Sequence, residues 1–498
     1  MTQGAQTSED TARGWRPYHT LWGLPLLCWT MSAADRTLTG PVVTWMIEAD
    51  AGILAGADKP FALGGLIGGL FFAGYMLTQW PGGYLGDRYG HRTIIVISMF
   101  WAALATVLTG IVSGLAIFIA ARVITGLGEG AYYSNDRSLI TAKTPLSKRS
   151  LGMGVAITGL AIGITIATLW APDLIDWGIS AFGQDEGWRM PFFVLGAITF
   201  AVAGVVWLNF RRHEPGLPYG RATLGMLAYA VPALAAVMAV YFIGDAAGLS
   251  NLAIAFLEVL LALGLIGFIF ARQTDDVGTV VRRRELMLLN GASFAVLWNL
   301  WFFGFWSVAI VADAAGSSFG RSAMIAAFNA GAGILGFPAG GWLADYALRR
   351  GWGRKGMLLS FIAVQFVLTA AFGVYIAQGS PDPWVMAALL FSASLFFNAL
   401  QPIGHALVAD IAEPEHHGTA FGFYNLVGEM AAVLSPAVSG ALRDATGEWT
   451  TAVYLDAAII AVSFVFVLFV RERQTSRVFA EARSQPAVRE PELAGRRN

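Results

Sequence analysis

The sequence contains little charge and almost no cysteine. Charged residues make up 13% of its 498 positions, whereas soluble domains contain about 25%. A chain with so few charges suits a lipid environment, where most of the surface needs no hydration. The single cysteine, Cys28, excludes an intramolecular disulfide, and its apolar neighbours predict a small packing residue. The net charge of −1 gives no reason to expect a nucleic acid as a partner.

Motifs that would indicate an enzyme are also missing from the sequence. No metal-ligand cluster, phosphate-binding loop or nucleophile motif stands out, so we expect neither enzymatic activity nor a bound cofactor or metal. Residues 1–18 are polar and lack the basic and then apolar pattern of a cleavable signal peptide. We therefore expect the first apolar run of the chain to stay in the membrane.

Long hydrophobic runs, in contrast, are abundant. Because a bilayer core of about 30 Å needs roughly 20 mostly apolar residues in one helix, each such run predicts a transmembrane helix. Fourteen runs meet this description, near 19–46, 62–82, 93–113, 114–136, 150–172, 190–209, 223–244, 249–271, 287–312, 322–346, 356–378, 384–409, 418–440 and 450–470. The sequence thus predicts an all-α polytopic membrane protein with fourteen transmembrane helices.

Basic loops alternate with loops that carry few basic residues. The basic loops lie near 87–92, 143–149, 211–213, 282–284, 349–355 and 471–473, and the others near 50–60, 173–188, 245–250, 313–320, 379–383 and 444–449. Loops rich in Lys and Arg stay in the cytoplasm. The alternation therefore predicts a multi-pass protein of the plasma membrane, specifically a bacterial inner membrane, with both termini in the cytoplasm.

Short sequence segments recur in the two parts of the chain. Pro81 to Asp87 is echoed by Pro338 to Asp345, and Arg149 to Gly154 is echoed by Gly418 to Gly422. Such repeats predict two related halves with a binding site at their interface near the middle of the membrane, opened alternately to each side. We expect an N-terminal tail over 1–18, six-helix halves over 19–212 and 287–470, a linker with two extra helices over 213–286, and a C-terminal tail over 471–498.

The loop after the second run carries a glycine-rich, charged motif. Gly83-x-Leu85-Gly86-Asp87-Arg88-x-Gly90-His91-Arg92 resembles the signature loop of the major facilitator superfamily, with His91 in place of the usual Arg or Lys. The resemblance covers roughly residues 19–212 and 287–473. It implies a gate in which Asp87, with Arg88, Arg92 and the second-half Asp345, locks the halves together on the cytoplasmic side. The alternative is a basic loop that only sets topology.

Two predicted helices carry charges in the middle of apolar runs. Asp35 and Arg36 are neighbours in the first run, and Arg122 and Glu129 lie seven residues apart in the fourth. Seven residues are nearly two helical turns, so Arg122 and Glu129 share one helix face. Ionisable residues at the centre of a span cost about 2.5–3.5 kcal/mol each on insertion scales and are usually functional.

These charges suit the coupled transport of an anion. An Arg guanidinium can hold a carboxylate through two parallel hydrogen bonds. A carboxylic acid removed from water favours its neutral form and can carry a proton. We therefore predict proton-coupled symport of a small organic anion, such as a sugar acid, driven by the proton gradient. The alternative is a salt-bridged cluster that only pins the two helices together.

The same charges belong to a recognisable pattern. Asp35-Arg36 with Arg122-x-x-x-Gly126-x-Gly128-Glu129-Gly130 resembles the anion:cation symporter family, which includes hexuronate, galactonate and phthalate permeases. The resemblance implies that Arg36 and Arg122 bind the substrate carboxylate and that Asp35 and Glu129 carry protons. Tyr75 matches a sugar-acid contact more loosely, and we expect Asn425 to line the cavity from the second half. Spinster-like lysolipid carriers share the pattern, so a lysolipid or drug carrier is the alternative.

Three further ionisable residues are candidates for a role inside the membrane. His405 could relay protons or simply pack with a hydrogen bond, and Glu429 could line the second-half wall of the cavity. Glu258, in the inserted helix pair, could be protonated or bonded to a neighbour if that pair is peripheral.

A transporter-like membrane sensor is the alternative from another class of function. We expect a monomer whose partners are the anionic substrate, protons and the lipid bilayer.

Overall fold

The computed structural model describes residues 15–144, 149–271, 278, 280–349, 352–379, 381–413 and 417–471. Within these ranges the chain forms fourteen long helices and two short 3-10 helices, η1 (Gly52–Leu54) and η3 (Gln184–Glu186), and no strand. The long helices are α2 (Pro17–Glu48), α3 (Pro60–Tyr89), α4 (His91–Ile111), α5 (Leu115–Lys143), α6 (Arg149–Phe182), α7 (Arg189–His213), α8 (Tyr219–Ala246), α9 (Asn251–Ala271), α11 (Arg284–Ala315), α12 (Phe319–Arg349), α13 (Lys355–Ile376), α14 (Pro383–Ile411), α15 (His417–Thr446) and α16 (Thr450–Leu468).

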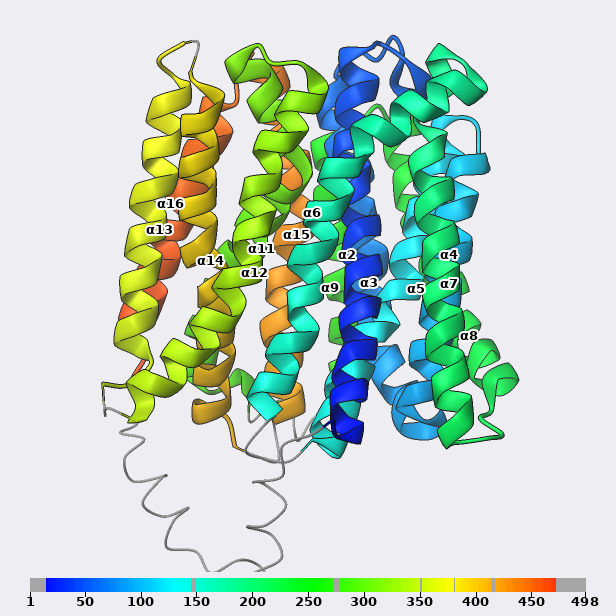
Figure 1. Cartoon of the computed structure of the whole chain (residues 1–498), viewed down its shortest axis with the longest axis vertical. Helices are drawn as coiled ribbons and strands as arrows, with labels where there is room; N and C mark the ends of the chain where they lie inside the picture. The colour runs from blue at the N-terminus through cyan, green and yellow to red at the C-terminus, as the bar shows by residue number, and fades with distance from the viewer. Residues whose placement is uncertain are drawn as a thin grey trace, which may run out of the picture.

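Each long helix coincides with one of the fourteen predicted hydrophobic runs, which confirms the all-α membrane fold. Over the described residues, twelve helices are long and apolar enough to cross a membrane. Helix α2 is not among the twelve; it carries Asp35 and Arg36 among several Thr and Ser residues. It nevertheless runs the full height of the bundle beside its neighbours (Figure 1). Helix α9 is apolar over the shorter stretch Asn251–Leu265.

The helices pack as two groups joined along three contacts. In the N-terminal half (α2–α7), α2 packs on α6, α3 on α5, and α4 on α5 and α7. In the C-terminal half (α11–α16), α12 packs on α14, and α13 on α14 and α16. The halves meet where α3 contacts α15, α6 contacts α12 and α2 contacts α11. Figure 1 shows the groups side by side, with α13 and α16 at one edge and α7 and α8 at the other.

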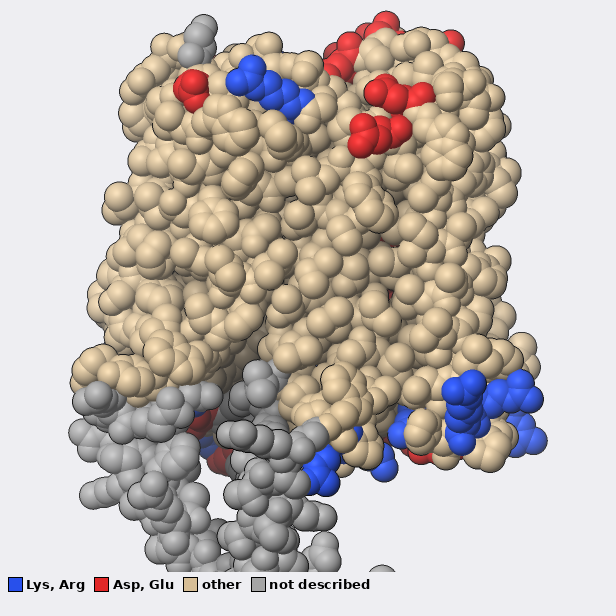
Figure 2. Space-filling view, viewed as in Figure 1, with Lys and Arg blue, Asp and Glu red and all other residues tan. Residues whose placement is uncertain are grey.

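The two ends of the bundle differ in charge. One end exposes Arg88, Arg211 and Arg212, whereas the other exposes Asp50 and Asp185. In Figure 2 most blue side chains lie at the lower end, most red ones at the upper end, and the tan belt between them shows no charge on this face. We call these the basic end and the acidic end. The separation is the one that the positive-inside rule produces in membrane proteins.

Close backbone packing seals the bundle at its acidic end. A β-carbon added at Gly65 of α3 would overlap the carbonyl oxygen of Pro436 in α15. The same holds in reverse, since a β-carbon at Gly440 of α15 would overlap the carbonyl oxygen of Phe61. Glycine is therefore required at both positions for helices of the two halves to approach this closely.

The inserted pair α8 and α9 lies against both halves. Helix α8 contacts α3, α4 and α5, whereas α9 contacts α3 of one half and α15 of the other. Glu258 of α9 has no exposed surface. Neither of its carboxylate oxygens has a hydrogen-bond partner in the described part of the chain. Helix α9 therefore lies between the halves while α8 stays at the edge of the bundle (Figure 1), and of the two states considered for Glu258, bonding to a neighbour is not observed within the described residues.

Candidate functional site

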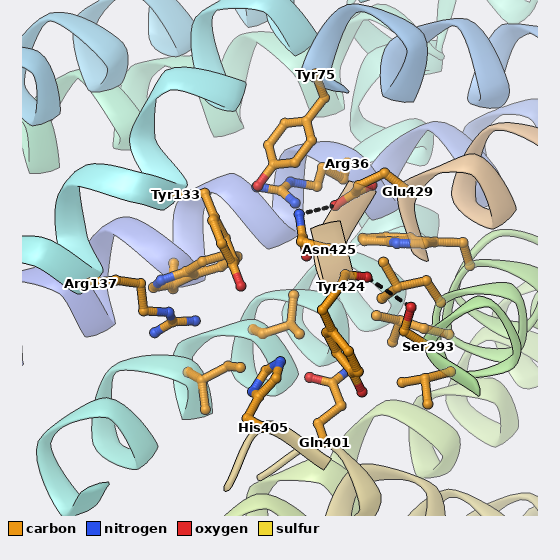
Figure 3. A pocket seen from close by; sticks show the side chains of 17 residues that line it. Arg36, Tyr75, Tyr133, Arg137, Ser293, Gln401, His405, Tyr424, Asn425 and Glu429 are labelled. Carbon is orange, nitrogen blue, oxygen red and sulfur yellow. Dashed lines mark hydrogen bonds between the residues drawn. The ribbon is translucent and has the colours of Figure 1, made fainter. Parts of the chain in front are cut away.

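A cavity lies between the two halves and is lined by helices of both. The empty space between the lining atoms amounts to about 570 Å³, and part of it is open to solvent. Polar and aromatic side chains point into it from both halves (Figure 3). The lining residues are Trp29, Arg36, Tyr75, Tyr133, Arg137, Ile157, Leu160, Ser293, Val296, Leu297, Leu300, Trp301, Gln401, His405, Tyr424, Asn425 and Glu429.

Arg36 of α2 supplies a positive charge to this cavity. Its Nε donates to Oε2 of Glu129 at 2.9 Å, and its Nη2 donates to the Ser32 hydroxyl at 2.6 Å. The guanidinium carbon lies 4.3 Å from the ring centre of Tyr75 and 5.3 Å from that of Trp29. Nε and Nη2 are thus occupied, whereas Nη1 has no carboxylate partner within the described residues and lies on the side of the guanidinium that a ligand could approach past Tyr75.

Glu129 of α5 occupies the other side of Arg36. Its Oε2 accepts both the Arg36 bond and a 2.5 Å bond from the Ser32 hydroxyl. Its Oε1 is buried and has no partner within the described residues. Glu129 is therefore an internal competitor for Arg36, and it has one oxygen that can accept a proton without breaking an existing bond.

Asp35 and Arg122 form a second buried pair, away from the cavity. Nη1 of Arg122 donates to both carboxylate oxygens of Asp35, at 3.3 and 3.1 Å, and Nη2 donates to the Asp35 backbone carbonyl at 3.2 Å. The Thr106 hydroxyl also donates to Asp35 at 2.7 Å. Both predicted residues are buried, and neither lines the cavity. In this conformation Arg122 therefore cannot contact a ligand in the cavity.

Arg137 of α5 is a cavity residue that the sequence analysis did not identify. The hydrophobic run on α5 was expected to end near residue 136, which would have placed Arg137 in a loop, but the helix continues to Lys143. Arg137 lies eight residues beyond Glu129, on the cavity wall. Its Nη1 lies 3.6 Å from Oδ2 of Asp136 and has no hydrogen-bond partner within the described chain. Arg137 lies one residue beyond the predicted end of the span, so an extension by a single turn would have included it.

The opposite wall carries a polar cluster that joins the halves. Nδ2 of Asn425, on α15, donates to Oε1 of Gln79 on α3 at 3.0 Å, and lies 3.4 Å from Oε1 of Glu429. Oε2 of Glu429 is buried and unpartnered in the described part of the chain. Asn425 and Tyr75 thus lie in the cavity wall, as expected for ligand contacts, and Glu429 adds a carboxyl group beside them (Figure 3).

The predicted gate residues lie at the basic end. The side chain of Asp87 is 78% exposed, and its carboxylate lies 3.6 Å from Nε2 of His91 in the same half. Arg88 is exposed and lies 5.5 Å from the ring centre of Tyr89. Arg92 pairs with Glu214 at 2.7 Å. The side chain of the fourth predicted gate residue, Asp345, lies outside what the structure describes.

Comparison with known proteins gives consistent matches along the chain. The family model described as Major Facilitator Superfamily matches residues 26–305 and 289–497. The probable sulfoacetate transporter SauU of Cupriavidus necator is 28% identical over 411 residues, which cover 82% of this chain and 84% of that protein. The D-galactonate transporter of Escherichia coli is 25% identical over 407 residues, covering 80% and 84%. A solved bacterial homolog of the human lysosomal transporter Spinster, in an inward-facing and occupied conformation, shares the fold with a TM-score of 0.65 and 18% identity, covering 95% of this chain and 100% of that one.

Proposed function

Because this chain belongs to the major facilitator superfamily, it is a membrane transporter and not an enzyme, and we propose that it carries a small organic anion together with protons. The observation that carries the proposal is Arg36, whose guanidinium lines the cavity and is held on one side by Glu129. Sulfoacetate and galactonate, which name two of the relatives, are both organic anions. A cavity lined by a guanidinium suits that class of substrate.

The charges around the cavity favour coupling to protons. Three arginines share the buried middle of the bundle with four carboxyl groups, namely Arg36, Arg122, Arg137, Asp35, Glu129, Asp136 and Glu429. With every group ionised, the cluster already has excess negative charge. An anion can then enter a low-dielectric site only if a carboxylate is neutralised. Protonation of Glu129 would release Arg36 to the substrate, so the proton and the anion would bind together.

Asp35 and Arg122 have a different part in this proposal. The two side chains form an ion pair with each other, and neither lines the cavity. We assign Arg122 to holding α5 against α2 rather than to binding substrate in this state. Asp35 stays as a second candidate for the proton, because a movement of α2 that opens the pair would expose it. Asn425 and Tyr75 are the substrate contacts on the remaining walls.

Alternating access would open this site first to one side of the membrane and then to the other. The acidic end is sealed by the contact of α3 with α15, whereas the cavity is lined by parts of α5 and α14 that lead toward the basic end. We propose that the basic end faces the cytoplasm of a bacterium and that both termini lie there. Reporter fusions at residues 247 and 498 test this: they should read periplasmic and cytoplasmic, and two cytoplasmic readings contradict it.

A lipid or drug carrier is the competing proposal, and an apolar groove is the structural feature that supports it. The groove lies between α4, α5, α7 and α8, and is lined by residues such as Phe100, Leu104 and Trp207. It shares no residue with the central cavity. A lipid in this groove would not contact the charged groups of the central cavity. The groove therefore does not explain why Arg36 lines that cavity.

The proposed function is tested by uptake into proteoliposomes. The purified protein should accumulate an organic anion when the outside is more acidic than the inside, and a protonophore should abolish the accumulation. Arg36→Gln should abolish uptake at unchanged protein level, whereas Arg211→Gln, on the outer surface of α7, should have no effect. Uptake that ignores the pH gradient contradicts proton coupling. Binding without any transport would favour a sensor.

A further inference from the structure

Two arginines of the cavity contact the same aromatic side chain. The guanidinium carbon of Arg36 lies 5.3 Å from the ring centre of Trp29, and that of Arg137 lies 5.5 Å from the same ring. The two cations can therefore be no further apart than the sum of these distances. In Figure 3 Arg36 lies beside Tyr75 and Asn425, and Arg137 lies beside Tyr133. Two positive groups thus line one cavity, and their separation has an upper limit set by the shared ring.

Each of these arginines has a carboxylate neighbour, which is hydrogen-bonded to Arg36 but only approaches Arg137 at 3.6 Å. Glu129 binds Arg36 through Oε2, which also accepts the Ser32 hydroxyl, while Oε1 is buried without a partner. Asp136 approaches Arg137 through Oδ2, which also accepts the indole N–H of Trp29 at 2.7 Å. Its Oδ1 is likewise buried without a partner in the described chain.

Protonation has the same consequence at both arginines, namely that the carboxylate next to each one loses its negative charge. In each case, a proton added to the free carboxyl oxygen removes the negative charge that neutralises the arginine. The arginine then lacks a counter-ion in a low-dielectric site, a state that strongly favours an incoming anionic group. Nη1 of Arg36 has no carboxylate partner in the described chain, and Nη1 of Arg137 has no hydrogen bond there.

We propose that the substrate carries two anionic groups, one bound by Arg36 and the other by Arg137, with Arg137 determining the preference for such diacids. The proposal rests on the proposed transport of an organic anion and narrows its substrate class. A short chain between the two acidic groups fits the limited separation of the arginines. Tyr133, Gln401 and Tyr424 line the intervening space and offer hydrogen bonds to substituents on that chain.

The test compares acids that differ by one acidic group. Binding of D-glucarate and D-gluconate, of sulfoacetate and acetate, and of succinate and butyrate is measured by calorimetry on the purified full-length protein. A charge-assisted pair is worth about 1.5–3 kcal/mol, so the diacid of at least one pair should bind roughly 10–100-fold more tightly than its monoacid. Arg137→Gln should remove that advantage and change monoacid binding by less than about threefold.

Matched variants separate recognition from folding. Arg137→Lys keeps the charge but not the planar fork, so it should restore part of the advantage. Arg211→Gln removes an exposed arginine of the same end and should change neither acid. Equal loss of both acids in Arg137→Gln, or no diacid preference in the unaltered protein, overturns the inference while leaving anion transport intact. Absence of binding and uptake for all six acids overturns the proposed function itself.

Discussion

Arg36 and Glu129 are joined by a 2.9 Å hydrogen bond between Nε and Oε2 inside the bundle, on two helices, α2 and α5. The alternative interpretation of these charges was a salt bridge that only holds two helices together. Arg36 and Glu129 do form a salt bridge, but Arg36 also lines the cavity. A pair that only pinned helices would be better placed away from a cavity, as Asp35 and Arg122 are. Under the proposed function, its position beside the cavity makes the first pair the point where substrate and proton compete for the same groups.

Substitution of Glu129 separates substrate binding from proton coupling. Glu129→Gln keeps the shape and can still accept from Ser32, but it cannot release a proton. We expect it to bind the anion and to exchange it across the membrane, while losing accumulation driven by a pH gradient. Paired counterflow and pH-gradient uptake in proteoliposomes measure the two activities. Accumulation by Glu129→Gln would show that Glu129 is not the coupling site, and Asp35 would become the candidate.

Asp35 and Arg122 should behave as one structural unit. Removing one partner leaves a buried charge uncompensated, which costs about 3–5 kcal/mol. Arg122→Gln should therefore lower the melting temperature in detergent markedly, and Asp35→Asn in combination should recover part of the loss. The single Asp35→Asn variant completes the double-mutant cycle. Additive losses in the cycle would mean that the two side chains do not depend on each other.

The fold was predictable because its main signal, the length of apolar runs, depends on local sequence. The fourteen runs and the alternation of loop charges required no knowledge of packing. The site was predictable only in part. Arg36, Tyr75 and Asn425 do line the cavity. Which acid pairs with which arginine depends on the rotation of α2 against α5, and the sequence contains no measure of that rotation. Arg137 was missed because the end of α5 was placed too early.

The position of the inserted pair α8 and α9 in the bundle could not be predicted from the sequence either. Sequence order places α8 and α9 between the halves, but their hydrophobicity is the same whether they lie at the edge or along the seam. Only the structure shows α9 against both α3 and α15. This matters for Glu258, because its carboxyl group is buried there without a hydrogen-bond partner in the described part of the chain.

Glu258 should be replaceable by an apolar residue. A buried carboxyl group without a donor is costly, and exchanging it for a side chain of similar size removes that cost. We expect Glu258→Leu to leave the melting temperature unchanged or to raise it, and Glu258→Gln to lower it slightly. A hydrophobic carbodiimide should label Glu258 in peptide mass spectra, with the exposed Asp58 as a control. A strong loss of stability in Glu258→Leu would reveal a partner that Glu258 needs.

Asp87 should influence which side the cavity faces. In this conformation its carboxylate is exposed and contacts His91 of its own half, so Asp87→Asn should cost this state little. If Asp87 locks the halves in the opposite conformation, the variant should populate the present state more. Labelling of a cysteine at Ile157, in a Cys28→Ser background, should then increase. Asp58→Asn, at the acidic end, serves as the matched control. Unchanged labelling and transport would mean that the loop only sets topology.

The bare backbone contact between α3 and α15 has a consequence for proton leakage. Where Gly65 meets the carbonyl of Pro436, no side chain stands between the helices that could swing aside and admit water. A continuous file of water molecules can form at this end only when whole helices separate as rigid bodies. Liposomes containing the protein without substrate should accordingly pass protons no faster than empty ones. The membrane potential that a coupled carrier depends on is then not dissipated while the carrier waits for its cargo.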